Sequence, residues 1–249
     1  MSEAEENEKL WANFSLANEL SPAQRHRWRL VVNELVGLPD RAVVADLGCG
    51  SGALLERIAR AHPDAHLVGI DVEPSALELA KRRLPSAELV RSDLDAEAGA
   101  MASLLGRADA VVCSEVLEHL DSPERALRLA RDLLRPHGRL VVTVPAGPMN
   151  DFDRSIGHRK HYRLNELTSL LKGAGFEIVR ASAWGFPFHT MFRIALAATP
   201  QTTGRFTDDR IGLLHRALFE VLNTLFYLNV RSRRVGRQLI ATAALPAGA

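Results

Sequence analysis

The sequence has few cysteines, almost no net charge and no long apolar run. Its two cysteines, Cys49 and Cys113, are too few for a disulfide framework and lack metal-ligand spacing, so we expect both to be reduced and buried. A formal charge of +1 without a basic stripe gives no reason to expect nucleic acid as a partner. No run approaches the roughly 18 apolar residues of a transmembrane segment. The amino terminus is acidic, whereas a signal peptide is basic and then apolar, and we expect a cytoplasmic protein.

The remaining composition is typical of a soluble globular enzyme. Hydrophobic residues make up 47% of the chain and charged residues 24%, and no internal repeat or low-complexity tract is present. A chain of 249 residues can bury a full core, and we interpret it as a single domain. Its expected parts are a helical N-terminal cap (1–40), a cofactor-binding core (41–183), a helical insertion or lid (184–235), and a last strand with a tail (236–249).

Residues 43–54 are the segment around which this core is organised. Apolar residues lead into Asp46, glycines follow at alternate positions (Gly48, Gly50 and Gly52), and a helical pattern begins at once. This predicts a buried strand, a tight turn and a helix whose first N–H groups face the turn. We therefore expect a nucleotide-like ligand at the carboxyl end of the strand.

Two kinds of cofactor are compatible with this turn. It satisfies the G-x-G-x-x-G/A pattern of dinucleotide-binding folds. Asp46, however, could receive the amino group of a methionine moiety and would repel a pyrophosphate, and Gly52 extends the pattern to D-x-G-x-G-x-G. Both features favour S-adenosylmethionine. Asp71 ends a second buried strand and is suited to bind ribose hydroxyls, which both cofactors carry.

Strand and helix patterns alternate from residue 41 onward, which predicts a parallel sheet with crossover helices on both faces. The expected strands are 43–46, 67–71, 88–91, 110–113, 139–144 and 176–182. The expected helices of this region are 52–61, 75–83, 123–134 and 165–174. Ligands of such sheets bind outside the carboxyl ends of the strands.

Several motifs in this order give the sequence a family resemblance. They are 45–52, the acid Asp71, 91–94, 114–120 (S-E-V-L-E-H-L) and 134–140. Together they cover about residues 42–182 and resemble a class I S-adenosylmethionine-dependent methyltransferase of the small-molecule type. The resemblance implies a Rossmann-like α/β fold with a seven-stranded, mostly parallel sheet, in which residues 237–243 form the seventh, antiparallel strand. The helical extension and the helical insertion are additions to this fold.

The resemblance also implies a cofactor site for S-adenosylmethionine. An acid at the position of Asp93 accepts the adenine amino group in this family, and the next residue, Leu94, packs on the ring. Asp95 and Glu97 are nearby alternatives that we expect in solvent. The predicted cofactor-binding residues are Asp46, Gly48, Cys49, Gly50, Gly52, Asp71, Val72, Asp93, Leu94 and Ser114.

Histidines are the candidate catalytic groups. Methyl transfer depends mainly on alignment, and a base matters only when the acceptor must lose a proton, a role that histidine suits near neutral pH. His158 and His161 lie in residues 157–162 (G-H-R-K-H-Y), which resemble the G-H-x-[RK]-x-Y sequence of small-molecule methyltransferases; a solvated basic loop is the alternative. His119, in the 114–120 motif, is a third candidate whose role is catalytic, structural or on the cofactor side.

Residues 114–120 could alternatively form a metal-binding site. Glu115, Glu118 and His119 have the spacing of a metal site in a related quinone-biosynthesis branch. One such cluster without a fourth ligand is weak support. We therefore expect no metal.

The parts outside the core have several interpretations. Ser21-Pro22 predicts the start of a helix, on which Trp28 either packs or joins Trp11 and Phe14 in a lid over the cofactor. The apolar stripe of the insertion packs on its own domain or a dimer partner, lines a substrate pocket, or lies on a membrane surface with the help of nearby arginines. The stripe is Ile211, Leu214, Leu218, Val221, Leu222, Leu225, Phe226 and Leu228, and the arginines are Arg231, Arg233 and Arg234. Further side chains that form either a pocket wall or core packing are Asp151, Asp153, Trp184, Phe186, Phe188 and His189.

The sequence thus predicts methyl transfer from S-adenosylmethionine to a hydroxyl or amine of a small molecule, such as a secondary metabolite, a sugar or a quinone-like ring. A nicotinamide-dependent oxidoreductase and a noncatalytic partner subunit with the same fold are the alternatives. The expected partner is the small-molecule acceptor, and peripheral contact with a membrane is a further possibility. The protein is expected to be a monomer or a homodimer.

Overall fold

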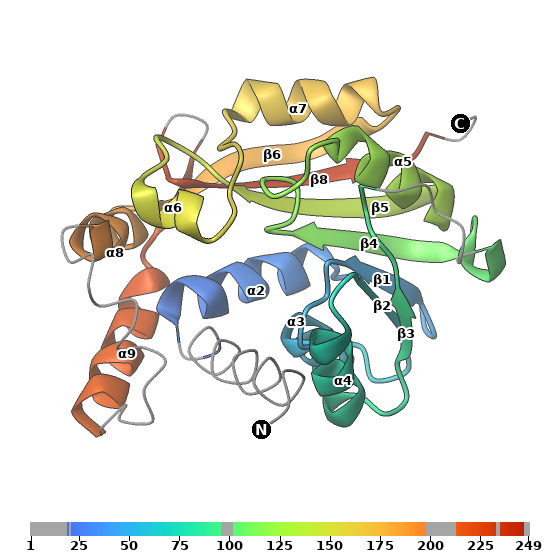
Figure 1. The fold of residues 1–249 in the computed structure, drawn as a ribbon, viewed down its shortest axis with the longest axis horizontal. Helices are drawn as coiled ribbons and strands as arrows, with labels where there is room; N and C mark the ends of the chain where they lie inside the picture. Colours follow the sequence, from blue (N-terminus) through green and yellow to red (C-terminus); the bar gives the residue numbers. More distant parts are fainter. Residues whose placement is uncertain (1–18, 20, 96–101, 198–212, 233–234, 247–249) are drawn as a thin grey trace.

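An eight-stranded sheet forms the middle layer of the molecule (Figure 1). The computed structural model describes residues 19, 21–95, 102–197, 213–232 and 235–246. Within these residues the strands are β1 (Val43–Leu47), β2 (His66–Asp71), β3 (Glu88–Arg91), β4 (Ala108–Ser114), β5 (Leu134–Pro145), β6 (Glu177–Phe186), β7 (Val230–Ser232) and β8 (Gln238–Ala244). Their order in the sheet is β3-β2-β1-β4-β5-β8-β6-β7. The pairs among β1 to β5 are parallel, and β8 is antiparallel to both β5 and β6.

The prediction of seven strands is wrong by one short strand. β6 continues past its predicted end at Ser182 to Phe186, so the sheet extends into the segment expected to be a helical insertion. The last residues of β6 would leave an unpaired edge, and an unpaired edge exposes main-chain hydrogen-bonding groups. β7 covers this edge by antiparallel pairing with Ala183, Trp184 and Phe186.

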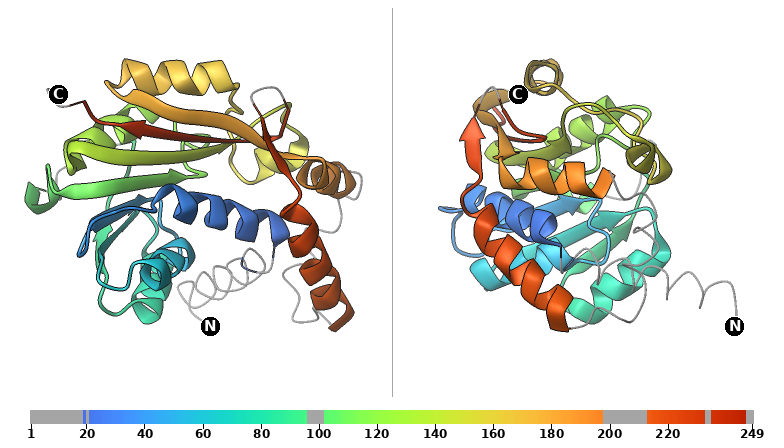
Figure 2. Two further views of the ribbon diagram at one scale, coloured as in Figure 1. Left: turned by 180° about the vertical axis from the view of Figure 1, so that it is seen from behind. Right: turned by 90° about the vertical axis from the view of Figure 1, so that its left-hand side faces the viewer.

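Helices cover both faces of the sheet (Figures 1 and 2). They are α2 (Pro22–Glu34), α3 (Ala53–Ala61), α4 (Pro74–Arg83), α5 (Pro123–Leu133), α6 (Asp151–Ser155), α7 (Leu164–Gly173), α8 (Phe188–Ala197) and α9 (Leu213–Phe226), with a 3-10 turn at Ala102–Leu104. α5 and α7 pack on one face around a core that includes Leu127 and Leu167. α2, α3 and α4 pack on the other face, around Val31 and Ile58. The four core helices predicted from the sequence are present, with bounds that differ by at most one residue.

The starts of β4 and β5 are earlier than predicted. β4 begins at Ala108, and β5 begins at Leu134, directly after α5. Leu134 pairs with Ala108, and an irregularity in the pairing separates this contact from the regular ladder that begins at Ala110 and Arg139. The apolar pattern that predicted β5 starts only with the regular ladder.

α2, which lies within the predicted helical cap, packs against the sheet and against α9. Trp28 is buried in the core beside α3, with the Arg57 guanidinium 4.6 Å from its ring, so packing and not a lid role is observed for this residue. Trp11 and Phe14 lie outside the described residues. Figure 2 shows α9 crossing the end of α2, where His26 meets Phe226 at a ring distance of 6.2 Å.

The apolar stripe of the insertion is partly buried by this contact. Phe226 is fully buried, Leu222 and Leu225 are half-buried, and Val221 and Leu228 are exposed. Ile211 and the side chains of Leu214 and Leu218 lie outside the described residues, as do Arg233 and Arg234. Arg231 forms an ion pair with Glu34 of α2. In the described part of the chain, every helix falls short of the length and apolarity needed to cross a membrane.

Candidate functional site

The glycine turn lies between the ends of β1 and β2. The N–H groups of Gly48 and Cys49 both donate to the Ile70 carbonyl, and the Gly50 N–H donates to Asp71 Oδ2 at 2.8 Å. Gly48 has a φ of +71°, and a side chain there would meet Val116 at 2.4 Å. Gly50 has a φ of +52° but faces open space, with no atom within 4 Å of where its Cβ would lie. The first glycine therefore admits a protein segment, and the second leaves room for a ligand.

Two acids flank this open space. Asp46 is buried at the end of β1, and burial, followed by the charge of Asp71, raises its pKa well above the usual range. A positively charged ligand group beside Asp46 would remove this penalty, because a nearby cation favours the ionised carboxyl. Asp71 is half-buried and also accepts from the Glu73 N–H at 3.0 Å.

The other predicted cofactor residues lie at the same edge of the sheet. Val72 is 53% exposed just after β2, whereas Leu94 is buried after β3. Ser114 is half-buried at the end of β4 and shares a 2.8 Å hydrogen bond with Thr143. Cys49 is buried with its sulfur directed at the Gly50 carbonyl, and burial raises the pKa of its thiol. Both cysteines are free and buried, as predicted.

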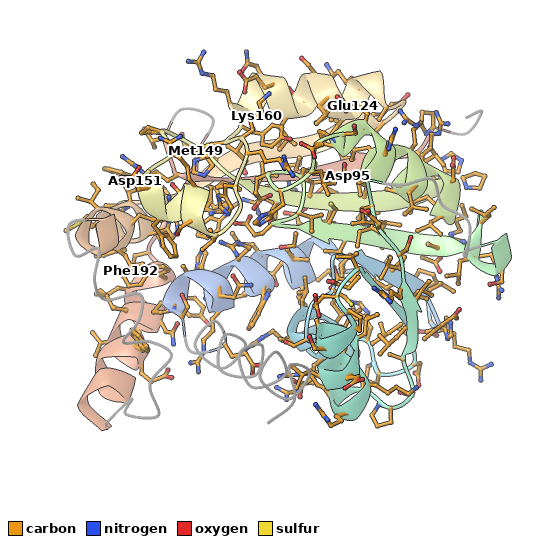
Figure 3. The ribbon with its side chains drawn as sticks, in the orientation of Figure 1. Asp95, Glu124, Met149, Asp151, Lys160 and Phe192 are labelled. Carbon is orange, nitrogen blue, oxygen red and sulfur yellow. The ribbon has the colours of Figure 1, made fainter. Side chains whose placement is uncertain are left out.

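The loop after β3 distinguishes Asp93 from its neighbour Asp95. Asp93 is exposed and accepts from the Asp95 N–H at 2.9 Å. Asp95 is not free in solvent as expected, because its carboxylate accepts from the N–H groups of Asp121 and Ser122 just before α5. Figure 3 shows Asp95 on the α5 side of the molecule, near Glu124. Asp95 thus anchors the loop and leaves Asp93 at the surface. Glu97 lies outside the described residues.

The two histidine motifs form one structure. The Arg159 N–H donates to the Glu118 carbonyl at 2.8 Å, and the Tyr162 hydroxyl donates to the Leu117 carbonyl at 3.1 Å. These bonds fasten residues 157–162 onto residues 115–121, and they bring the rings of His119 and His158 to 4.8 Å in an edge-to-face contact. A solvated basic loop accounts for Arg159 and Lys160, which are exposed. It does not account for His158 and His161, which are half-buried, or for Tyr162, which is buried.

His158 continues into a chain of hydrogen bonds. Its Nδ1 is 3.0 Å from His161 Nε2, and His161 Nδ1 is 3.1 Å from the Gly147 carbonyl. Burial, followed by the nearby His119 and His161, lowers the pKa of His158 to about 4. Burial also lowers the pKa of His119 and of His161. All three imidazoles are therefore uncharged at neutral pH.

The two glutamates of the 114–120 motif have different environments. Glu115 has a φ of +59°, rare for a residue with a side chain, and its carboxylate binds Thr143, Arg27 and Gln238 at 3.0 to 3.2 Å. Glu118 is fully buried, and among the described residues neither of its carboxylate oxygens has a hydrogen-bond partner. Burial, followed by the charge of Glu115, raises the pKa of Glu118 well above its usual range.

Two groups of three side chains come close enough to share an ion. Each group places one ligand atom per residue within 4.8 Å: Glu118, His119 and His158 form one, and Asp153, His158 and His161 the other. The Asp153 carboxylate of the second group already binds Arg193 in an ion pair, and three candidate ligands without a fourth are weak support for a metal site. We therefore assign no metal ligands, and the expectation of no metal stays a prediction.

Sequence reasoning missed several residues near these motifs. Arg27 of α2, Gln238 of β8 and Arg193 of α8 reach Glu115 or Asp153 from distant parts of the chain, and no motif marks them. Trp184 and His189, by contrast, are two of the predicted candidates for a pocket wall or for core packing, and they are buried side by side with ring centroids 5.0 Å apart.

The remaining candidates for a pocket wall or for core packing differ in their burial. Phe188 is half-buried, and Phe186 is 47% exposed at the end of β6. Asp151, the first residue of α6, is exposed, whereas Asp153 on the same helix is fully buried.

The fold and the site together define a Rossmann-like, nucleotide-binding class of enzyme. Comparisons with known proteins indicate which kind of enzyme within this class it is. Residues 45–140 match the sequence model of a family described as "Methyltransferase domain". The chain is 34% identical over 133 residues to a ubiquinone biosynthesis O-methyltransferase of Cupriavidus pinatubonensis, covering 53% of this chain and 51% of that protein. It is 35% identical over 106 residues to the protein of the same name from Xanthomonas axonopodis pv. citri, covering 42% and 44%.

A solved structure extends the likeness in fold. Phosphoethanolamine N-methyltransferase 2 of Haemonchus contortus, solved with S-adenosylhomocysteine, superimposes with a TM-score of 0.60 at 15% identity, over 91% of this chain and 54% of that one. The matched domain and the shared fold support a class I S-adenosylmethionine-dependent methyltransferase. It spans about half of the length of the curated relatives it matches.

The site fits the cofactor of this class, S-adenosylmethionine. Gly50 leaves open space beside the turn, and the part of the chain that the structure describes pairs no cation with the buried Asp46 carboxyl, so the amino group of the cofactor could supply one. A pyrophosphate at the same place would add negative charge to two acids, which disfavours a nicotinamide dinucleotide.

Proposed function

We propose that the protein transfers a methyl group from S-adenosylmethionine to an aromatic hydroxyl of a small, quinone-like molecule. The observation that carries the proposal is the packing of residues 157–162 on residues 115–121. It brings the ring of His158 against His119, which follows three residues after Val116, the residue that fills the space above Gly48. The segment 116–119 therefore contacts both the glycine turn and the candidate base.

The residues around the glycine turn hold the cofactor in this proposal. Asp46 pairs with its amino group, Asp71 binds its ribose, and Asp93 and Leu94 contact its adenine. Gly48, Cys49, Gly50, Gly52, Val72 and Ser114 shape the surrounding surface. When bound, S-adenosylmethionine supplies a methyl group on a positively charged sulfur, so the task of the protein is alignment.

His158 is the proposed base. A hydroxyl must lose its proton as the new bond forms, whereas an amine can lose it afterwards. Because its pKa is lowered, the imidazole is uncharged at neutral pH, so one of its ring nitrogens carries a proton and the other has a lone pair that can take the proton of the acceptor. A buried base therefore supports a hydroxyl acceptor more than an amine. His119 and His161 border the same position and are the secondary candidates.

The proposed chemical class of the acceptor is based on the names of the curated relatives. Both curated proteins described above are named O-methyltransferases of ubiquinone biosynthesis. The matched part excludes much of their length, so the quinone-like acceptor is a proposal for this chain. The noncatalytic alternative predicts a loss of the glycine turn or its acids, and all of them are present here.

Calorimetric titration tests the cofactor first. S-adenosylhomocysteine is expected to bind the wild type and NAD is not. Asp71→Asn, which keeps the size of the side chain, is expected to bind at least about tenfold more weakly, since it loses a charge-assisted hydrogen bond. Asp132→Ala, at an exposed position of α5, is the matched control. NAD binding without S-adenosylhomocysteine binding would support the oxidoreductase alternative instead.

The transfer of a labelled methyl group then tests the acceptor. Catechol, phenol and aniline are the probes. Methylation of catechol or phenol is expected, with kcat reduced about 100-fold in His158→Ala and affinity for S-adenosylhomocysteine unchanged. Methylation of aniline alone would refute the hydroxyl acceptor. Cofactor binding without any methylated product would refute the aromatic acceptor class.

A further inference from the structure

The direction of the histidine chain follows from its last acceptor. The Gly147 carbonyl has no proton to give, so His161 must carry its ring proton on Nδ1. The uncharged His161 ring then accepts at Nε2. His158, 3.0 Å away, must donate to it from Nδ1. The other ring nitrogen of His158, Nε2, is left with its lone pair.

A buried carboxylate stands close to this chain and could reverse it. Asp153 Oδ2 lies 3.8 Å from His161 Nε2, and both side chains are almost fully buried, at 0% and 3% exposure. A carboxylate in a buried site draws a donor toward itself. If His161 instead carried its ring proton on Nε2 and donated it to Asp153, His158 would lose its hydrogen-bond acceptor. The ring proton of His158 would then no longer be held on Nδ1.

Arg193 of α8 satisfies that carboxylate. Its guanidinium donates to Asp153 Oδ1 at 2.8 Å and to Oδ2 at 2.9 Å, and the Asn150 N–H donates to Oδ2 at 2.9 Å. The arginine is itself mostly buried, at 17% side-chain exposure. Asp153 therefore has charged and neutral donors that do not come from His161.

We propose that His161 and Arg193 are positioning residues for His158: His161 fixes the ring proton on His158 Nδ1, and Arg193 keeps Asp153 from reversing the chain. This rests on the proposed role of His158 as the base. Neither positioning residue takes the acceptor's proton. Both determine which nitrogen of His158 is free to take it.

The two residues come from separate parts of the fold. His161 belongs to the loop after α6, whereas Arg193 belongs to α8, in the segment between β6 and β8 that the sequence marked as an insertion. Figure 3 shows Asp151 of α6 and Phe192 of α8 at the same end of the molecule. The insertion thereby contributes to the arrangement of the base without contacting the reacting atoms.

The tautomer can be read directly by nitrogen NMR of histidine-labelled protein. In the wild type, His158 is expected to be protonated at Nδ1 and bare at Nε2. His161→Leu removes donor and acceptor together, and Arg193→Met frees Asp153; both are expected to lose the Nδ1-protonated signal of His158. His161→Gln offers an amide donor and an amide acceptor, and Arg193→Lys keeps a cation, so both are expected to retain the signal.

Kinetics provide the second readout. His161→Leu and Arg193→Met are expected to lower kcat about 10- to 100-fold with KM changed less than about threefold, because the base and not acceptor binding is affected. His161→Gln and Arg193→Lys are expected to stay within about fivefold of the wild type. Arg154→Met removes the exposed partner of Asp151 on α6 and is the matched control, with no expected change.

Three results would overturn the proposal. The first is a wild-type His158 protonated at Nε2. The second is an unchanged His158 tautomer in both His161→Leu and Arg193→Met. The third is a change of the His158 signals on adding EDTA, which would place an ion on the nitrogen argued to be free. The tautomer is measured without methyl transfer, so an inactive protein with the expected tautomer would refute the proposed function alone.

Discussion

Gly48 and Gly50 lie in the same turn, yet their lack of a side chain serves different contacts. Both have positive φ angles, at which any side chain costs about 1 kcal/mol or more. Only Gly48 faces a protein neighbour, because its Cβ would lie 2.4 Å from a methyl group of Val116, whereas Gly50 faces open space. Stability and ligand binding can therefore be separated by substituting one residue at a time.

Gly48→Ala is expected to destabilise the protein by about 2–4 kcal/mol, since strain and overpacking add. Gly50→Ala is expected to cost about 1 kcal/mol of stability but to weaken S-adenosylhomocysteine binding at least about tenfold. Urea unfolding and calorimetric titration of both variants measure the two effects. Equal losses of stability, or full affinity in Gly50→Ala, would contradict this division.

At the scale of elements, Glu34 joins the end of α2 to the far strands of the sheet. Its carboxylate accepts from Thr242 of β8 at 2.8 Å and from Arg231 of β7 at 2.9 Å, and the residue is only 8% exposed. Burial alone would raise the pKa of Glu34, but these hydrogen bonds outweigh it and the pKa is lowered. α2 is thereby held on the sheet at one end and against α9 at the other.

Glu34→Ala is expected to destabilise the protein by about 2–3 kcal/mol, because it removes the buried carboxylate to which Arg231 and Thr242 donate. Glu220→Ala removes the α9 side of the Arg25–Glu220 ion pair, which also joins α2 to its surroundings but is 31% and 65% exposed. This exposed pair is expected to contribute less than about 1 kcal/mol. Urea unfolding of the two variants provides the test, and similar losses would show that α2 is not held by Glu34.

For the whole molecule, buried histidines predict sensitivity to acid. The pKa values of His26, His119, His158, His161 and His189 are all lowered in the fold, each chiefly by burial. The unfolded chain takes up protons on these rings near pH 6.5, while the folded protein does not until a lower pH. Their contribution to stability is therefore full above about pH 6.5 and is lost as the pH falls toward 4.

His26 offers the test of this linkage, because it packs between Trp184 and Phe226 and its pKa is about 4. His26→Phe keeps an aromatic ring but cannot take up a proton. The free energy of unfolding of the wild type is expected to fall by about 1–2 kcal/mol more than that of the variant between pH 7 and pH 5. Urea unfolding at pH 7, 6 and 5 measures the difference, and parallel curves would exclude His26 as a contributor.

Much of the fold could be predicted because local patterns specify it. The helices at 53–61, 74–83 and 123–133 follow apolar periodicity and proline or glycine starts, and their bounds were correct to within a residue. β7 could not be predicted, because its three residues are too few to show a periodic pattern. They pair with β6 because β6 continues to Phe186. The sheet therefore has one strand more than the sequence indicated.

The site divides in the same way. The glycine turn and its acids are contiguous or end consecutive strands, so their convergence follows from the parallel sheet. His119 and His158 are 39 positions apart in the chain. Neither of the two motifs alone determines the role of its histidine. Their contact depends on hydrogen bonds between backbone groups, such as the one from Arg159 to Glu118, which residue types do not encode.

The amino-acid sequence by itself determined the class of fold, the position of the glycine turn and the identity of the acids beside it, because these depend on short-range patterns and on the fixed geometry of parallel strands. Only the tertiary structure decided which histidines meet, that Asp95 is an anchor and that Arg193 satisfies Asp153. These contacts join segments far apart in the chain. Their formation depends on how whole elements pack, which is a property of shape and burial and not of local sequence.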